Sequence, residues 1–188
     1  MTIQSFQPGV NGDDGMIRGP GTWFQQYTGF GNYGGNEQHA WVRFPNVTIA
    51  QGTIISSAII RFKALRSDAT NVVTIIDGST GNNPPAPVSF ATYPTVGLTT
   101  AKVNWSPAAW TLDTEYDSDE IKTVVQEIID QGTWDSGDAM LLLIHNNGSD
   151  GGAERYAYDY NDNPSFSAQL IINSGSPGPG RRGYPLFL

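Results

Sequence analysis

Alternating apolar and polar positions dominate the middle of the chain and predict short β-strands. In the clearest stretch, Ile60, Phe62 and Ala64 alternate with Arg61 and Lys63, which is the period of a strand with one buried face. Similar alternation, or a β-branched run, predicts further strands at residues 22–27, 39–44, 72–76, 101–105, 108–112, 154–160 and 167–173, the second of them ended by Pro45. Residues 139–145 (AMLLLIH) are almost entirely apolar, so we expect a central strand covered on both faces.

The period changes at residues 118–131, which predict one amphipathic helix lying across the sheet. Its apolar residues follow the spacing i, i+3, i+4, i+7, i+8, which forms one stripe on a helix. They are Ile121, Val124, Val125, Ile128 and Ile129. Asp117 and Glu120 have the spacing of a capping box, and Gly132 is suited to end the helix.

Glycine, proline and asparagine mark the ends of the predicted strands. Asp77 and Gly78 form a turn signal after the strand at 72–76, and residues 78–87 (GSTGNNPPAP) predict a loop. About seven to nine short strands separated by such signals are typical of a β-sandwich. The sequence therefore predicts an all-β protein of two packed sheets and one helix.

The two ends of the chain differ in composition from its middle. Residues 1–36 are rich in glycine, asparagine and aromatic residues and predict an N-terminal segment with one or two short strands. Serine, glycine and proline dominate residues 174–183, as in a linker. We expect a sandwich domain at residues 1–173, and at 174–188 a Gly/Pro linker that ends in an extended apolar anchor tail.

Composition and charge narrow the possible functions. The chain has 188 residues and a net charge of −8, and its 10 lysines and arginines form no basic patch, so we expect no nucleic-acid partner. Cysteine is absent, which excludes disulfides and favours synthesis in a reducing cytoplasm. The first residues do not resemble a signal peptide, and the longest apolar runs are too short to span a bilayer.

Three stretches resemble DNRLRE-type jelly-roll domains. They are AWVRFPNVTIAQGTIISSAIIRFKA (residues 40–64), SDEIKTVVQEIIDQGTWDSGDAMLLLI (118–144) and RYAYDYNDNPSFSAQLII (155–172). The resemblance covers roughly residues 10–173 and implies a jelly-roll sandwich. Related domains occur as carbohydrate-associated modules of secreted enzymes and as structural domains of bacteriophage virion proteins. This chain shows no secretion signal and no attached catalytic domain, which favours the phage branch.

The residues that usually carry catalysis are sparse. His39 and His145 each lie at the end of a predicted strand without an evident orienting acid, so we interpret both as structural and expect no metal site. No G-x-S-x-G elbow, P-loop or G-x-G-x-x-G fingerprint opening a helix is present. We expect that the protein is not an enzyme and has no cofactor.

Two weaker binding chemistries stay open. The loop 159–163 (DYNDN) alternates Asp and Asn, as calcium loops do, although Asx-rich turns usually bond their own backbone. Other acidic candidates are the pairs Asp13 with Asp14 and Asp135 with Asp138. Exposed aromatic rings could stack on sugars, although packing into the core is the more common role of such rings. The candidates are Trp23, Tyr27, Phe30, Tyr33, Trp105, Trp110 and Trp134.

The tail is the predicted partner-binding site. Its residues are Arg181, Arg182, Tyr184, Leu186, Phe187 and Leu188. Burying a Leu or Phe side chain contributes roughly 1.5–3 kcal/mol, and the arginines can bond a partner's carboxylates. The tail either folds back onto its own sandwich or enters a groove on another subunit.

The second arrangement predicts a bacteriophage virion protein. We expect a capsid decoration or cement protein, made in the host cytoplasm and located in the virion. Its partners would be the major capsid protein or other virion subunits, and the chain itself would form a homo-oligomer, with a trimer as the working assumption. The alternative is a carbohydrate-binding or host-recognition module of a phage head or tail fibre.

Overall fold

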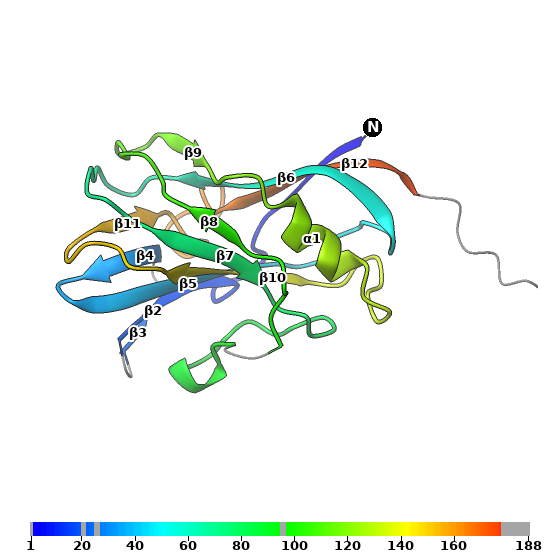
Figure 1. Cartoon of the computed structure of the whole chain (residues 1–188), viewed down its shortest axis with the longest axis horizontal. Coiled ribbons are helices and arrows are strands. Elements are labelled where there is room, and N and C mark those ends of the chain that lie inside the picture. Colours follow the sequence, from blue (N-terminus) through cyan, green and yellow to red (C-terminus); the bar gives the residue numbers. More distant parts are fainter. Residues whose placement is uncertain (1, 20–21, 25–26, 95–96, 178–188) are drawn as a thin grey trace, which may run out of the picture.

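The computed structural model describes residues 2–19, 22–24, 27–94 and 97–177, which form an all-β sandwich of jelly-roll type with one helix (Figure 1). Sheet A has four strands in the order β1-β12-β6-β9. Sheet B has eight strands, of which six follow the order β11-β4-β5-β10-β7-β8, while β2 pairs with β5 and β3 with β2. The fold class predicted from the sequence is confirmed.

The strand and helix bounds are as follows. Sheet A contains β1 (Thr2–Phe6), β6 (Thr53–Lys63), β9 (Glu115–Asp117) and β12 (Gln169–Pro177). Sheet B contains β2 (Asp14–Arg18), β3 (Thr22–Phe24), β4 (Thr28–Tyr33), β5 (Asn36–Phe44), β7 (Thr74–Gly78), β8 (Val103–Trp105), β10 (Met140–Asn146) and β11 (Glu154–Ala157). The helices are α1 (Lys122–Ile129) and a 3-10 turn, η1 (Phe90–Thr92).

The main core lies between the two sheets and follows the predicted alternation. Ile60 and Phe62 of β6 are fully buried. The ring of Phe62 stacks on Trp105 of sheet B at 5.6 Å between centroids, an arrangement that adds to the stabilisation from area burial. The strand predicted at 108–112 is reduced to an isolated bridge between Asp68 and Trp110.

The helix carries the predicted apolar stripe but begins later than expected. Its buried residues are Val124, Val125, Ile128 and Ile129. The four residues before it pair with the edge of β6: Ser118 N donates to Ile60 O at 2.8 Å, and Ile121 N donates to Ala58 O at 2.8 Å. These bonds satisfy a strand edge, so α1 begins at Lys122 instead of residue 118, and the expected capping box is replaced by an uncapped Ile121.

The turn predicted at Asp77 and Gly78 is wrong, because both residues lie inside β7. Gly78 pairs with Leu142 and Asp77 with Leu143 of β10. A Cβ atom at Gly78 would lie 2.7 Å from Ile128 Cδ1 of α1. The glycine therefore permits the close approach of the helix to the strand, and the chain does not turn here.

Both faces of β10 are buried, as predicted, because a long connection covers the outer face of sheet B. This connection, the outer loop, comprises residues 79–94 and 97–102 between β7 and β8. A second apolar cluster forms beneath it from Ile17, Trp41, Tyr93, Leu141 and Leu143. The outer loop turns a two-layer sandwich into three layers at this position.

The last strand continues past residue 173, where the compact domain was expected to end. Ser174 pairs with Thr2 of β1 and Ile55 of β6, and Pro177 pairs with Thr53. β12 lies between β1 and β6 and is an interior strand of sheet A. None of the helices in the described part of the chain is long and apolar enough to cross a membrane.

Candidate functional site

The residues of the candidate site come from one face of sheet B. Strand pairing sets Ile17 of β2 opposite His39 of β5, and His145 of β10 opposite Ile75 of β7. The two histidine rings lie 5.7 Å apart between centroids. Because alternate residues of a strand share a face, Asp77 lies on the same face as Ile75. Residues far apart in sequence therefore meet on the outer side of the sheet.

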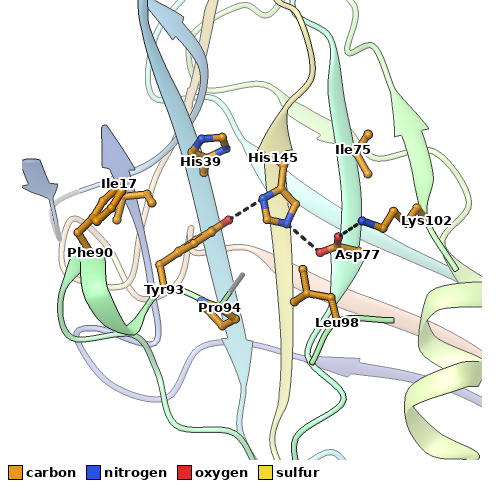
Figure 2. Close-up of a pocket in the computed structure, with 10 residues that line it drawn as sticks. All are labelled: Ile17, His39, Ile75, Asp77, Phe90, Tyr93, Pro94, Leu98, Lys102 and His145. Carbon is orange, nitrogen blue, oxygen red and sulfur yellow. Dashed lines mark hydrogen bonds and ion pairs between the residues drawn. The ribbon is translucent and has the colours of Figure 1, made fainter. Parts of the chain in front are cut away.

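A chain of polar contacts links three strands and the outer loop (Figure 2). Asp77 is fully buried, with His145 Nε2 2.9 Å from its Oδ1 and Lys102 Nζ 3.3 Å from its Oδ2. Tyr93 Oη lies 3.3 Å from His145 Nδ1 and donates to Ala40 O at 3.3 Å. A carboxylate only accepts hydrogen bonds, so His145 Nε2 carries the proton that bonds Asp77.

The outer loop is held by this chain of contacts. Burial, with a smaller contribution from the charge of Asp77, raises the pKa of Tyr93 well above its ordinary value. The hydroxyl of Tyr93 therefore stays protonated and serves as a hydrogen-bond donor. The expectation that neither histidine has an orienting acid is wrong for His145, because strand pairing brings Asp77 to it.

His39 has a different environment from His145. Its Nδ1 accepts a hydrogen bond from Asn146 N at 3.1 Å, and its Nε2 lies 3.6 Å from Glu37 Oε2. Burial first, and then the neighbouring His145, lowers the pKa of His39, and Glu37 partly opposes this effect. His39 is therefore the neutral tautomer with its proton on Nε2.

Two adjoining hollows form a trough beside these side chains. The larger has a volume of about 370 Å³ and the smaller about 300 Å³, and His39 and Phe90 line both. The walls of the larger half are mostly apolar: Ile17, Ile75, Phe90, Pro94 and Leu98. The smaller half is polar, with Gly19, Gly35, Asn36 and Glu37. Binding sites commonly combine an apolar wall with a few polar groups in this way.

The contacts of His145 hold the outer loop against sheet B. A catalytic histidine holds its orienting acid through one nitrogen and presents the other to the reacting group. In His145 one nitrogen meets Asp77 and the other meets Tyr93. Nε2 bonds Asp77 and Nδ1 faces the buried Tyr93 hydroxyl, so this contact chain fastens the outer loop to sheet B.

Asp13, Asp14 and the loop 159–163 lie elsewhere, where β2 meets the loop after β11, and Asp135 and Asp138 precede β10. Asp159 is fully buried and its Oδ1 accepts from Asp162 N at 2.8 Å, while both oxygens of Asp14 accept from Tyr160 N at 3.1 Å. Asp138 likewise accepts from Asp135 N. Among the described residues, no group of three or more His, Cys, Asp or Glu side chains is arranged to hold a metal ion.

Burial dominates the electrostatics of that acidic junction. It raises the pKa of Asp14 to about 8 and the pKa of Asp159 to about 6, and the repulsion between the two carboxylates adds to the shift of Asp14. Asp159 Oδ2 is buried without a hydrogen-bond partner in the described structure. A protonated carboxyl group at Asp14 relieves this repulsion.

Most of the aromatic candidates for sugar stacking prove to be core residues. Those that are buried are Phe30, Trp105, Trp110 and Trp134. Tyr33 is exposed and its ring is covered by the guanidinium of Arg18. The side chain of Trp23 lies outside the described residues, as do all six predicted partner-binding residues at positions 181–188.

The sequence offered little signal for the trough. Asp77 stands next to a glycine in a pair that favours a turn, and Tyr93 and Phe90 lie in a loop without periodicity. Lys102 is the last residue of the outer loop before the short edge strand β8, whose pairing partner is distant in sequence. One signal was available: if the β-branched strand at residues 72–76 is continued through Asp77, the period of two sets that side chain on the face of Ile75.

Comparison with known proteins adds no relative. No family model matches the sequence, and no curated protein matches it.

Proposed function

We propose that the protein is a structural protein of a bacteriophage virion, a capsid decoration or cement protein that binds neighbouring subunits. The observation that carries the proposal is the position of β12. This strand is hydrogen-bonded to β1 on one side and β6 on the other, and it ends at Pro177. A partner bound by residues 178–188 would therefore be coupled to an interior strand of a rigid sheet.

Exposed apolar residues near the end of β12 support a contact surface there. Ile3 stands on β1 opposite Asn173, and Ile54 follows Thr53, the pairing partner of Pro177. Both isoleucines are more than half exposed. Exposed apolar side chains near a segment that binds a partner, here residues 178–188, are typical of surfaces that contact another protein.

The phage component of the proposal rests on the resemblance to DNRLRE-type domains of virion proteins. In this role the sandwich is a rigid body, and many weak tail contacts on a lattice add up through avidity. The partners are the major capsid protein or other virion subunits, and the chain also associates with itself, with a trimer as the working assumption.

The test compares the full chain with a variant that ends after Pro177. Sedimentation velocity is expected to show an oligomer for the full chain and a monomer for the shortened one, while circular dichroism shows the same β-rich spectrum for both. The control is the full chain with Ile59→Ser, a substitution on the outer face of sheet A that leaves residues 178–188 in place. It should associate as the unaltered full chain does. Self-association that survives the shortening would overturn the role of the tail.

A carbohydrate-binding module is the second candidate, because Phe90 is 46% exposed at the rim of the trough beside Asn36 and Glu37. An aromatic ring next to amide and carboxyl groups suits a sugar. Binding on a glycan array that is lost on Phe90→Ala and kept on Tyr33→Ala would favour this candidate. No binding by the unaltered chain would eliminate it.

A further inference from the structure

The larger half of the trough is suited to apolar side chains. Ile75, Leu98 and Phe90 form its walls. The polar groups beneath them, Asp77, His145 and Tyr93, already contact one another. Because those groups lie beneath apolar walls and face one another, a ligand in this half gains mainly by burying apolar surface.

The smaller half of the trough is suited to a cation. The Glu37 side chain is 63% exposed. Its contacts in the described structure are His39 Nε2 at 3.6 Å and Asn146 Nδ2 at 3.3 Å. Neither group is a permanent cation, since His39 is neutral. An arginine arriving at this position would form a charge-assisted, bidentate pair with the carboxylate.

The chain itself contains a segment with this chemistry. Two arginines, Arg181 and Arg182, are followed by four large apolar side chains within residues 184–188. These arginines are the charged residues of 178–188, so the net charge of −8 leaves −10 on residues 1–177. The basic segment and the acidic body attract each other at long range.

We propose that the trough binds residues 181–188 of a second copy of the chain, with an arginine at Glu37 and the apolar side chains along Phe90, Ile75 and Leu98. This inference rests on the proposed assembly through the tail and names the surface that receives it. The ligand class is an extended peptide with basic residues followed by apolar ones.

The end of β12 and the β4–β5 turn lie at opposite ends of the sandwich, so the proposal assigns the segment to a second copy (Figure 1). β12 ends on the α1 side of the sandwich, whereas the β4–β5 turn, which directly precedes Asn36 and Glu37 of β5, lies at the other end (Figure 1). Glu37 and β12 belong to opposite sheets.

The interface would be head-to-tail. The tail and the trough are different surfaces of each copy, so repeated docking closes into a ring or continues as a lattice. A three-membered ring would satisfy the expected trimer, and in such a ring every tail and every trough is occupied.

Site-directed disulfides test the inference in the chain of residues 1–188, which contains no cysteine. One sample mixes a Phe187→Cys chain with a mass-tagged Phe90→Cys chain under mild oxidation. A second sample replaces Phe90→Cys by Val88→Cys, which is 72% exposed on the same loop but does not line the trough. We expect a mixed dimer in the first sample at least about tenfold more abundant than in the second.

A charge variant gives an independent readout. Glu37→Gln is expected to weaken self-association about tenfold, as measured by sedimentation equilibrium. Glu115→Gln, with a similar exposure of 61% but on sheet A, is expected to leave it unchanged.

The outcomes separate this inference from the proposed function. Equal yields in the two samples would overturn docking in the trough. If self-association nevertheless required the tail, the assembly proposal would stand and the tail would bind another surface. Self-association independent of residues 178–188 would overturn both. A trough that instead binds a glycan through Phe90 and yields no mixed dimer would also reject the peptide.

Discussion

At the residue scale, the buried ionisable groups are of two kinds. Some have partners that compensate for their charge, and others do not. Arg155 is 1% exposed, yet all three of its guanidinium nitrogens are satisfied, by Asp68 and by the carbonyl oxygens of four residues. Asp14 is equally buried, but it lies near Asp13 and Asp159, so its charge is repelled as well as desolvated. A buried charge is tolerated where partners compensate for lost hydration, and is otherwise neutralised.

Asp14 makes stability depend on pH in a defined direction. Its pKa is about 8 in the folded protein, against an ordinary value of 3.8. Between these values the folded state holds a proton that the unfolded chain has lost. The free energy of unfolding should therefore decrease as pH rises through this range, by up to about 1.4 kcal/mol per pH unit.

Urea unfolding of the natural chain and of Asp14→Asn across this pH range measures the effect. The variant keeps the shape of the side chain without its charge, so its stability should decrease less steeply with pH. Asp117→Asn, in an exposed ion pair with Arg61, is the control and should retain the natural slope. Parallel curves for the natural chain and Asp14→Asn would contradict the raised pKa.

At the element scale, close approaches decide which strands can pair. Gly31 of β4 pairs with Glu154 of β11 and has φ of +118°. A Cβ atom at this position would overlap the carbonyl oxygen of Ala153, which accepts the hydrogen bond from Asn32 N. The glycine is required both by its backbone conformation and by the neighbouring strand.

Two alanine substitutions separate these requirements. Gly31→Ala should lower the free energy of unfolding by about 3 kcal/mol or more, because strain and overlap combine. Gly34→Ala, also at positive φ (+57°) but with open space around it, should cost about 1 kcal/mol. Chemical denaturation measures both. Equal costs would show that the contact with Ala153 is relieved by a small shift of β11.

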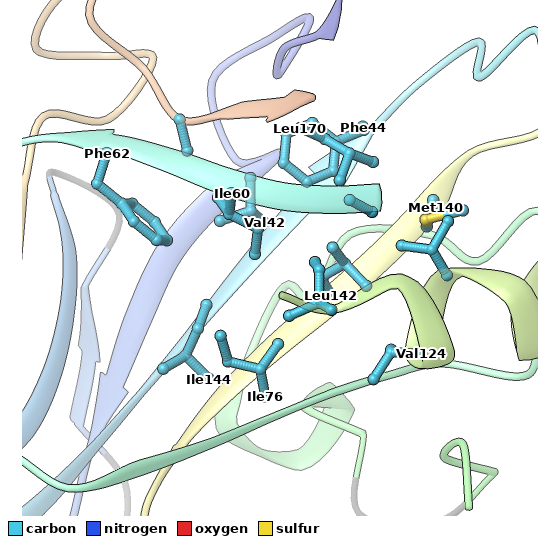
Figure 3. Packing of buried hydrophobic residues seen from close by; sticks show 14 of the residues in the cluster. Val42, Phe44, Ile60, Phe62, Ile76, Val124, Met140, Leu142, Ile144 and Leu170 are labelled. Carbon is cyan, nitrogen blue, oxygen red and sulfur yellow. The ribbon is translucent and has the colours of Figure 1, made fainter. Parts of the chain in front are cut away.

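At the scale of the whole molecule, sheet B separates two apolar layers of unequal size. Leu142 and Leu143 are consecutive and fully buried. Leu142 points into the main core near Ile60 and Ile76 (Figure 3), whereas Leu143 belongs to the cluster under the outer loop. The main core joins both sheets and α1, and the smaller cluster joins sheet B to the outer loop.

Truncating each leucine should have different consequences. Leu142→Ala is expected to destabilise the whole fold by about 2–5 kcal/mol. Leu143→Ala should cost less, because the outer loop can settle into the cavity, and it should selectively speed amide hydrogen exchange in the described residues of that loop. Equal losses of stability with uniform exchange would show that the three layers unfold as one unit.

The sequence by itself determined the local elements whose burial pattern is strong. Period-two alternation located β6, continuous apolarity located β10, and the helical stripe located the buried face of α1. Each signal arises because one element must hide a face from water, so neighbours in sequence carry it.

Only the tertiary structure decided features that depend on distant neighbours. Residues 117–121 pair with β6 because that strand offers a free edge, which delays the helix. Asp77 and Gly78 remain in β7 because β10 lies beside them, although their residue types favour a turn. His39, His145, Tyr93 and Lys102 converge because the strand order of sheet B, and the loop folded over it, set which residues share a face. Long-range pairing therefore created the candidate site, and no local pattern encodes that pairing.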